Sequence, residues 1–298
     1  MSDLTLGIDL GGTHMRAAVV DEDGRLLAHR VEPTPHQIDS LDGLIQLSAE
    51  VIAKRSLSHA VVGVPGPVDY GRGRMLYAPN LGTGWLEHLT AGGLSQALGV
   101  PVWLANDADL AAVGEAGFGA GRNFEDFVYI TVSTGVGAAA IMGHQLVHGL
   151  RSALEIGHTV VDWEAEARRE ASTVEELASG TAIAHQAVAI GLPADSAQVV
   201  ALAHRGDIRA QQIVDRASAV AAVAVLNLCQ LLAPQAVILG GGVGLSGTLT
   251  DPISDLLGRK VDGPLGRLPE LLLADLGDDA ALAGSAAWPR FFRVSSGR

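Results

Sequence analysis

The feature that most constrains the fold is a pattern of strand, small-residue turn and strand that occurs twice in the chain. The first copy covers residues 4–21, where an apolar run precedes Gly-Gly-Thr and a second apolar run. The second copy covers residues 127–142 and has Ser133 and Thr134 at the turn. Two such hairpins predict a duplicated fold. Turns of this kind let backbone N–H groups approach an anionic ligand closely, so each hairpin is a candidate phosphate loop.

Asp9 is an acidic residue inside the first apolar run, directly before the turn. An unpaired charge is costly in such a strand. A Mg²⁺ ion between Asp9 and a bound phosphate would explain the carboxylate. In the alternative interpretation, Asp9 only caps the turn of an ordinary hairpin. The second hairpin makes this alternative less attractive.

Between the two hairpins, apolar runs alternate with segments of helical periodicity, which predicts a largely parallel sheet covered by helices. Ligands of such sheets bind at the carboxyl ends of the strands, where Asn106 and Asp107 are expected. Alternatively, Asp107 only N-caps the helix that follows it. The expected elements are helices over 40–55, 86–98 and 108–117, and strands over 60–64 and 101–104.

After the second hairpin, the chain has one pair of polar candidates and one glycine run. Glu155 and His158 lie three residues apart around a glycine. The run Gly240, Gly241, Gly242 follows an apolar strand and indicates close backbone contact with a ligand or, alternatively, a flexible turn. The expected elements are helices from 173 onwards, over 195–205, over 209–233 and over 278–288, and strands over 236–239 and 271–274.

Composition excludes several functional classes. A hydrophobic content of 48% with 18% charged residues indicates a globular protein, and the net charge of −13 argues against a nucleic acid or an anionic membrane as partner. The start lacks a basic, cleavable leader, and the single Cys229 fits a reducing compartment. The apolar run 217–233 is short for a membrane span and is expected to be a buried core helix. We therefore expect a cytoplasmic protein.

The order of motifs resembles the bacterial sugar kinases of the ROK family (repressor, open reading frame, kinase), which have the actin-like, hexokinase-like ATPase fold. The resemblance covers nearly the whole chain and rests on LGIDLGGT, GVPGPVD, PNLGTGW, LANDAD, VSTGVG, EIGH, ELASGTAIA and ILGGGV. It implies an α/β fold of duplicated actin-like (ribonuclease H-like) domains with a cleft between them. Residues 1–116, with the C-terminal helix 279–298, would form a smaller domain for sugar and phosphate. Residues 117–278 would form a larger domain for ATP and sugar.

The resemblance also implies a role for each motif residue. Asp107 matches the general base, and Asp9 matches the residue that helps to place Mg²⁺ with ATP. The implied sugar ligands are Gly66, Asn80, Asn106, Asp107, Glu155, His158 and Glu175. The implied ATP and phosphate contacts are Asp9, Gly11, Gly12, Thr13, Thr134, Gly135, Gly137, Gly240, Gly241 and Gly242.

Two departures from the family pattern concern the sugar side of the site. Many members bind zinc through the His of the EIGH motif and three cysteines just downstream, but residues 160–173 contain no cysteine. His158 alone cannot supply the four ligands of structural zinc, so we predict no zinc. A short helix over 163–171 is expected to place Glu175 instead. The second departure is Leu154, which replaces the family's usual glycine before the first sugar-binding Glu.

The resemblance implies an ATP-dependent kinase for a hexose, with glucose or a close relative phosphorylated at its 6-hydroxyl. Fructose, mannose, N-acetylglucosamine and N-acetylmannosamine remain alternatives, as does polyphosphate as the donor. A non-catalytic sugar-binding protein is a second alternative, prompted by the missing cysteines and Leu154. A sugar-responsive transcriptional regulator would need a helix-turn-helix domain before the first hairpin, and the acidic charge disfavours it. The family leads us to expect a homodimer.

Overall fold

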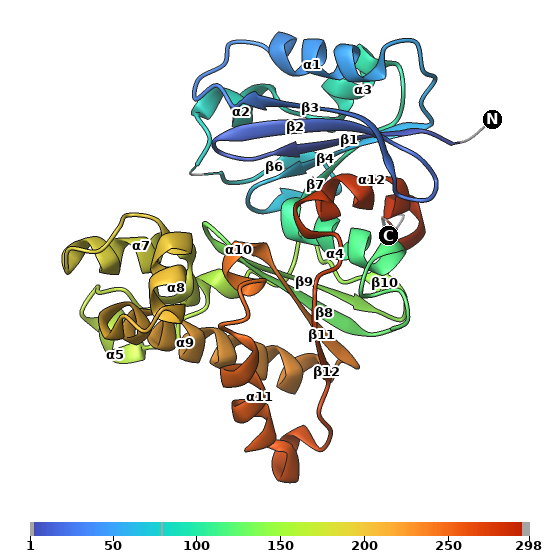
Figure 1. Cartoon of the computed structure of the whole chain (residues 1–298). Helices are drawn as coiled ribbons and strands as arrows, with labels where there is room; N and C mark the ends of the chain where they lie inside the picture. Colours follow the sequence, from blue (N-terminus) through green and yellow to red (C-terminus); the bar gives the residue numbers. More distant parts are fainter. Residues whose placement is uncertain (1–2, 79, 294–298) are drawn as a thin grey trace. The chain divides into compact units, whose positions relative to one another are not determined.

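The structure is a computed structural model that describes residues 3–78 and 80–293 (Figure 1). The chain divides into two compact units. Unit 1 comprises residues 1–123, 140–153 and 278–298, and unit 2 comprises residues 124–139 and 154–277. Compared with the division expected from the sequence, unit 1 also takes in residues 117–123 and 140–153.

Unit 1 is built on a sheet in the order β3-β2-β1-β4-β7. The strands β1, β2 and β3 pair antiparallel, whereas β4 pairs parallel with both β1 and β7. The elements are β1 (Thr5–Leu10), β2 (His14–Val20), β3 (Leu26–Pro33), α1 (Asp42–Ile52), β4 (His59–Val64), β5 (Val68–Asp69), β6 (Arg74–Met75), α2 (Thr83–His88), α3 (Ala91–Leu98), β7 (Val102–Asn106), α4 (Asp107–Phe118), β10 (Gln145–Leu146) and α12 (Ala280–Phe291).

Helices cover both faces of this sheet, with α1 and α3 on one side and α4 and α12 on the other (Figure 1). The close packing of α12 depends on small residues. A Cβ on Gly7 of β1 would lie 2.8 Å from the backbone oxygen of Leu282. Gly114 of α4 and Gly284 of α12 leave no room for a Cβ either, since each faces a backbone carbonyl of the other helix. The glycines therefore let α12 lie directly on the strand that carries Asp9.

The expected single helix over 86–98 is wrong. The chain forms α2 and α3 instead, separated by Leu89 and Thr90 in extended conformation. The Thr90 hydroxyl accepts a hydrogen bond from the Gly93 N–H and so caps α3. Threonine is a favourable N-cap residue, and this local preference outweighs the apolar periodicity across the break.

The second sheet lies mainly in unit 2, with β10 and the end of β9 counted in unit 1, and its strand order, β10-β9-β8-β11-β12, repeats that of the first sheet. In both sheets a hairpin is followed by parallel strands, so the predicted duplicated α/β fold is confirmed. The remaining elements are β8 (Phe127–Val132), β9 (Val136–Met142), η1 (Ile156–His158), α5 (Trp163–Ala167), α6 (Val174–Ala178), α7 (Gly180–Ala189), α8 (Ser196–His204), α9 (Ile208–Leu232), β11 (Ala236–Gly240), α10 (Gly241–Gly244), α11 (Thr250–Gly258), η2 (Val261–Leu265), β12 (Glu270–Leu273) and η3 (Gly277–Asp279).

The long helix α9 contains the apolar run that resembles a membrane span. By length and composition alone it could cross a bilayer, but a core helix of a soluble protein passes the same test. Of its apolar window, 56% is buried, and the helix packs against α6, α7, α8 and α11. This packing fits the core-helix interpretation.

Candidate functional site

The first candidate phosphate loop, residues 11–13, is held from one side by Thr34. The Thr34 hydroxyl donates to the Gly11 carbonyl at 2.7 Å, and the Thr34 N–H donates to the Thr13 carbonyl at 2.9 Å. Within the loop, the Gly11 N–H donates to the His14 carbonyl at 2.9 Å. Gly12 and Thr13 are exposed. The loop is therefore rigid on its carbonyl side and open to solvent at its tip.

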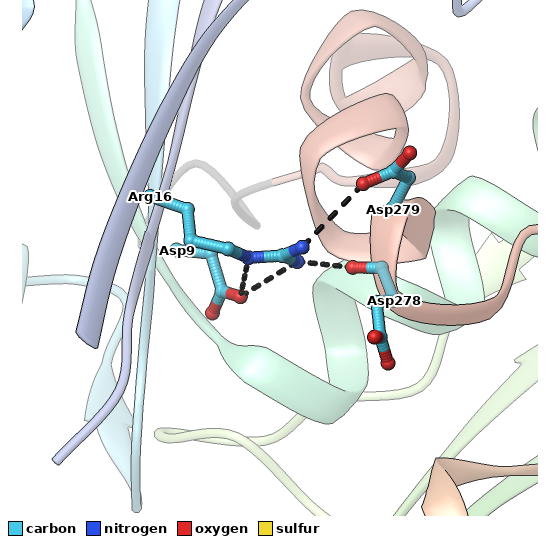
Figure 2. Close-up of polar contacts among 4 residues, drawn as sticks. All are labelled: Asp9, Arg16, Asp278 and Asp279. Atoms are coloured by element: carbon cyan, nitrogen blue, oxygen red, sulfur yellow. Dashed lines mark hydrogen bonds and ion pairs between the residues drawn. The ribbon is translucent and has the colours of Figure 1, made fainter. Parts of the chain in front are cut away.

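Asp9 is paired with Arg16, which lies opposite it across the hairpin (Figure 2). The Arg16 Nη2 and Nε atoms donate to one oxygen of Asp9, Oδ2, at 3.0 and 3.2 Å. Arg16 also contacts the Asp278 carbonyl, and its Nη1 donates to Asp279 Oδ1 at 3.4 Å. Burial raises the pKa of the Asp9 carboxyl above its ordinary value, although Arg16 acts in the opposite direction. Arg16 thus ties the strand before the loop to the start of α12.

The end of β7 presents Asp107 on a buried base. Asn106 is only 8% exposed, and its Oδ1 accepts from the N–H groups of Ala108 and Asp109 at 3.0 and 3.2 Å, which caps α4. Its Nδ2 donates to the Gly66 carbonyl at 3.1 Å. Asp107 itself is exposed. The N-cap is therefore Asn106, and Asp107 is the first residue of α4, with its Oδ1 accepting from the Ala108 N–H at 2.8 Å.

The structure brings two of the other sequence-predicted residues of unit 1 close to these groups. Gly66 has a φ of +86°, and a Cβ there would collide with the Tyr77 carbonyl, so glycine is required. Asn80 lies against the first loop, because a Cβ on Gly12 would be 3.0 Å from the Asn80 backbone oxygen. Gly66 thus adjoins Asn106, and Asn80 adjoins the loop.

Sequence reasoning missed a buried polar pair beneath this end of β7. The Tyr70 hydroxyl donates to Asp109 Oδ2 at 2.5 Å and accepts from the Asn106 N–H at 3.4 Å. Asp109 is 0% exposed. It stands within the LANDAD motif, two residues after Asp107, and an acidic residue in the buried first turn of a helix was the available signal.

In unit 2, the second candidate loop is held in the same manner as the first. The Ser133 carbonyl accepts from the Gly180 N–H at 2.7 Å. The Thr134 carbonyl accepts from the Thr181 hydroxyl at 2.8 Å. Thr134 is exposed. The start of α7 therefore anchors the carbonyl side of this loop, as Thr34 anchors the first one.

Glu175 is joined directly to the second loop. Its Oε2 accepts from the Val136 N–H at 2.8 Å. A Cβ on Gly135 would lie 2.5 Å from the same oxygen, so a side chain at position 135 would displace the carboxylate. The structure therefore brings together one predicted sugar ligand, Glu175, and one predicted phosphate contact, Gly135.

Glu155 is the central residue of a tight turn. Its φ and ψ are −66° and 57°, and the Ile156 N–H donates to the Leu154 carbonyl at 2.6 Å, which describes an inverse γ-turn. Leu154 has a φ of +54°, a conformation that favours glycine, so the family's glycine here has a physical reason. Gly157 touches the Val136 carbonyl so closely that no Cβ fits. His158 ends η1 and is exposed.

The three glycines after β11 differ in their surroundings. A Cβ on Gly240 would collide with the Tyr129 hydroxyl, and one on Gly241, with a φ of +77°, would lie 2.6 Å from Val132 O. Gly242 is exposed, with open space around its Cα. Packing alone therefore requires the first two glycines, and Gly242 is the position where a ligand can approach the backbone. Gly137 lies within β9.

The side chains of the site differ in how well they fit the two metals that the family resemblance brings into question, Mg²⁺ and zinc. Within residues 3–78 and 80–293, no three His, Cys, Asp or Glu side chains are grouped to hold a metal ion by themselves. Mg²⁺ in phosphate-transferring sites is bound by one or two carboxylates plus substrate phosphates and water, which a single Asp9 fits. Structural zinc needs about four N or S ligands, and the segment after His158 offers no sulfur. These residues therefore do not fit structural zinc.

Comparison with known proteins supplies the family. The family model described as "ROK family" matches residues 5–290. The bifunctional enzyme NanE/NanK of Brucella melitensis is 32% identical over 96% of this chain, but the chain spans only 54% of that enzyme. Glucokinase of Streptomyces coelicolor is 31% identical over 95% of this chain and 96% of its own. N-acetylmannosamine kinase of Yersinia pseudotuberculosis is 32% identical over 96% of this chain and 98% of its own.

Solved structures agree in fold. A ROK family glucokinase from Streptomyces griseus, in complex with glucose and AMPPNP, is 30% identical, with a TM-score of 0.79 over 95% of this chain and 98% of the other. A ROK hexokinase from Thermus thermophilus is 31% identical, with a TM-score of 0.80 over 96% of this chain and 97% of the other. The match of sequence and fold extends over nearly the whole chain. The chain therefore belongs to the ROK family.

Proposed function

We propose that this protein is a sugar kinase that transfers the γ-phosphoryl group of ATP to a hexose, glucose or a close relative, at its 6-hydroxyl. The observation that carries the proposal is the presentation of Asp107. It is an exposed carboxylate in the first turn of α4, held on a buried base by Asn106. Membership of a family that contains glucokinases supports the same reaction.

Phosphoryl transfer needs positioning, charge neutralisation and a group that accepts the hydroxyl proton. We assign proton acceptance to Asp107. The backbone of residues 11–13 and of residues 134–137 would cradle the phosphates, with their carbonyl sides fixed by Thr34 and by the start of α7. Asp9 would hold Mg²⁺ together with phosphate oxygens, and this ion would neutralise charge on the transferring group. Gly240, Gly241 and Gly242 would lie along the nucleotide.

A sugar has many hydroxyl groups, and each needs a hydrogen-bond partner once buried. We assign these contacts to amide, carboxylate and imidazole groups and to one backbone group. In unit 1 these are Gly66, Asn80, Asn106 and Asp107, and in unit 2 they are Glu155, His158 and Glu175. Relatives that act on glucose and on N-acetylmannosamine match at similar identity, so overall similarity does not distinguish the two sugars. We assign the choice between them to this set of residues.

The proposed setting is a cytoplasmic enzyme that acts as a homodimer on small molecules, without a nucleic acid or membrane partner. The net charge of −13 and the single buried Cys229 support the reducing compartment and disfavour nucleic acid and membrane partners, whereas the homodimer rests on the family resemblance. Light scattering tests the dimer, and a monomer at assay concentration would contradict it.

A coupled ADP-release assay with MgATP across glucose, mannose, fructose, N-acetylglucosamine and N-acetylmannosamine tests the function. We expect turnover with one of these sugars. The absence of turnover across the panel, with sugar binding intact, would refute ATP-dependent phosphorylation. The same panel with polyphosphate would then identify the other donor, and silence there too would leave a non-catalytic sugar-binding protein.

Asp107→Asn tests the base. The substitution keeps size and removes proton acceptance, so kcat should fall by about 10²–10⁴-fold, whereas sugar affinity should stay within about tenfold. Asp42→Asn is the matched control, because Asp42 is also an exposed aspartate in the first turn of a helix of unit 1. An unchanged kcat for Asp107→Asn would remove Asp107 as the base.

A further inference from the structure

Ser172 is a buried serine that uses all of its polar groups. It is 1% exposed and lies three residues before Glu175. Its hydroxyl donates to Glu166 Oε2 at 2.5 Å, and its N–H donates to Glu176 Oε2 at 3.0 Å. Its carbonyl accepts from the Val161 and Asp162 N–H groups at 2.8 and 3.2 Å. Ser172 therefore joins both ends of the segment between η1 and α6.

The two carboxylates around Ser172 come from different helices. Glu166 belongs to α5 and Glu176 to α6. Glu176 also accepts from the Thr173 N–H at 3.0 Å and the Thr173 hydroxyl at 2.9 Å, while the Glu176 N–H donates to Thr173 Oγ1, which completes a capping box at the start of α6. These hydrogen bonds lower the pKa of the Glu176 carboxyl. The start of α6 is thus fixed in place.

A fixed start of α6 determines where Glu175 points. Glu175 is the second residue of this helix, and its carboxylate meets the Val136 N–H of the second loop. Val174, beside it, is 0% exposed, and its N–H donates to the Thr159 carbonyl at 3.1 Å. A shift of α6 would therefore move Glu175 relative to the loop.

We propose that Ser172, Glu166 and Glu176 form a metal-independent clasp that positions Glu175 for sugar binding. Ser172 is then a positioning residue, acting through α6. The inference rests on the proposed function, since it takes Glu175 as a sugar ligand. It also assigns these hydrogen bonds the role that structural zinc cannot have here, because the segment lacks sulfur ligands.

Glu166→Ala is the first test, because Glu166 is exposed and its loss leaves the core intact. The variant removes the acceptor of the Ser172 hydroxyl. We expect its dissociation constant for the sugar, measured by calorimetry, to rise about tenfold, with the KM for ATP within about twofold of the parent value. Glu166→Gln retains an acceptor oxygen and should restore most of the affinity. Glu164→Ala is the matched control, since Glu164 is an exposed glutamate of the same helix. Its carboxylate makes a long ion pair with Arg168, at 4.0 Å.

Ser172→Ala tests the centre of the clasp. Its control is Ser218→Ala, the same substitution at a serine of unit 2 that is also 1% exposed but whose hydroxyl has no hydrogen-bond partner within the described residues. Amide hydrogen exchange over residues 174–178 provides a readout without sugar. We expect faster exchange there in Ser172→Ala and in Glu166→Ala, and parent-like exchange in both controls.

The outcomes separate the two proposals. A parent protein that phosphorylates no sugar refutes the proposed function. An active parent whose Glu166→Ala variant keeps parent sugar affinity overturns the clasp, even if exchange over α6 rises, because Glu175 is then placed by other contacts. A parent that loses sugar affinity under a zinc-selective chelator overturns the metal-independent part.

Discussion

Tyr70 is the residue whose substitution tests the scaffold of Asp107 most directly. Its hydroxyl joins Asp109 Oδ2 at 2.5 Å to the Asn106 N–H at 3.4 Å. Its ring packs against His148 and Phe292, with centroid distances of 5.4 and 4.8 Å. Tyr70→Phe therefore removes both hydrogen bonds and leaves the aromatic packing in place.

The size of the effect follows from the burial of Asp109. This side chain is 0% exposed, and removal of a partner from a buried polar group costs about 1–3 kcal/mol. The second bond adds little, because 3.4 Å is beyond the usual range. We expect the free energy of unfolding to fall by about 2 kcal/mol and the melting temperature by roughly 4–8 °C.

Catalysis should suffer as well, because Asp107 lies between the two residues that lose contact with Tyr70. A displacement of about 1 Å at a reacting group costs on the order of 10²-fold in rate. We expect a ten- to hundredfold lower kcat, roughly, with the KM for ATP unchanged. Scanning fluorimetry and the coupled assay measure both effects. Tyr77→Phe controls for the stability change, because Tyr77 is 55% exposed. A melting temperature within about 1 °C of the parent and an unchanged kcat would refute the reasoning.

Three other substitutions or conditions probe the remaining contacts. Arg16→Met removes both hydrogen bonds to the partly buried Asp9 and should lower the free energy of unfolding by about 1–2 kcal/mol in urea titrations; equal stability would show that solvent replaces Arg16. Leu154→Gly relieves a positive φ, so stability should stay level or rise by up to about 1 kcal/mol, and a clear loss would mean that the leucine side chain contributes more than its strain costs. The pKa of Glu176 is lowered from its ordinary 4.5, so its stabilising contribution is present above that pH and is lost as pH falls through the lower folded value. Amide protection factors at positions 172 and 173 should therefore fall below about pH 4 but not between pH 7 and 5.

Apolar spacing was sufficient to predict the duplicated architecture. The likeness of the 4–21 and 127–142 segments predicted two equivalent hairpins, and the two sheets have the same strand order. This worked because a strand buried on both faces must be apolar throughout, whichever helices cover it. The same logic placed Asn106 at the end of a buried strand.

Side-chain pairs that join distant segments could not be predicted in this way. Tyr70 and Asp109 are 39 residues apart, and nothing in the local pattern of either residue shows the other. The pairing of Arg16 with Asp9 could have been predicted, because a hairpin that closes around the Gly-Gly-Thr turn places the two residues opposite each other. The break before α3 was missed because apolar periodicity continues across it, whereas the cap at Thr90 is a local hydrogen bond.

The two loops show how one local design serves two different surroundings. Each loop has its carbonyls engaged from one side, by Thr34 in unit 1 and by the start of α7 in unit 2. At the second loop the nearby carboxylate comes from a separate helix, since Glu175 of α6 meets the Val136 N–H and occupies the space that a side chain at Gly135 would need. A carboxylate there would repel a bound phosphate unless hydrogen-bond donors balanced its negative charge. If Glu175 binds a sugar hydroxyl, the Val136 N–H shares its negative charge and links this sugar ligand to the second loop, just as the contact of Asn80 with Gly12 would link a sugar ligand to the first loop.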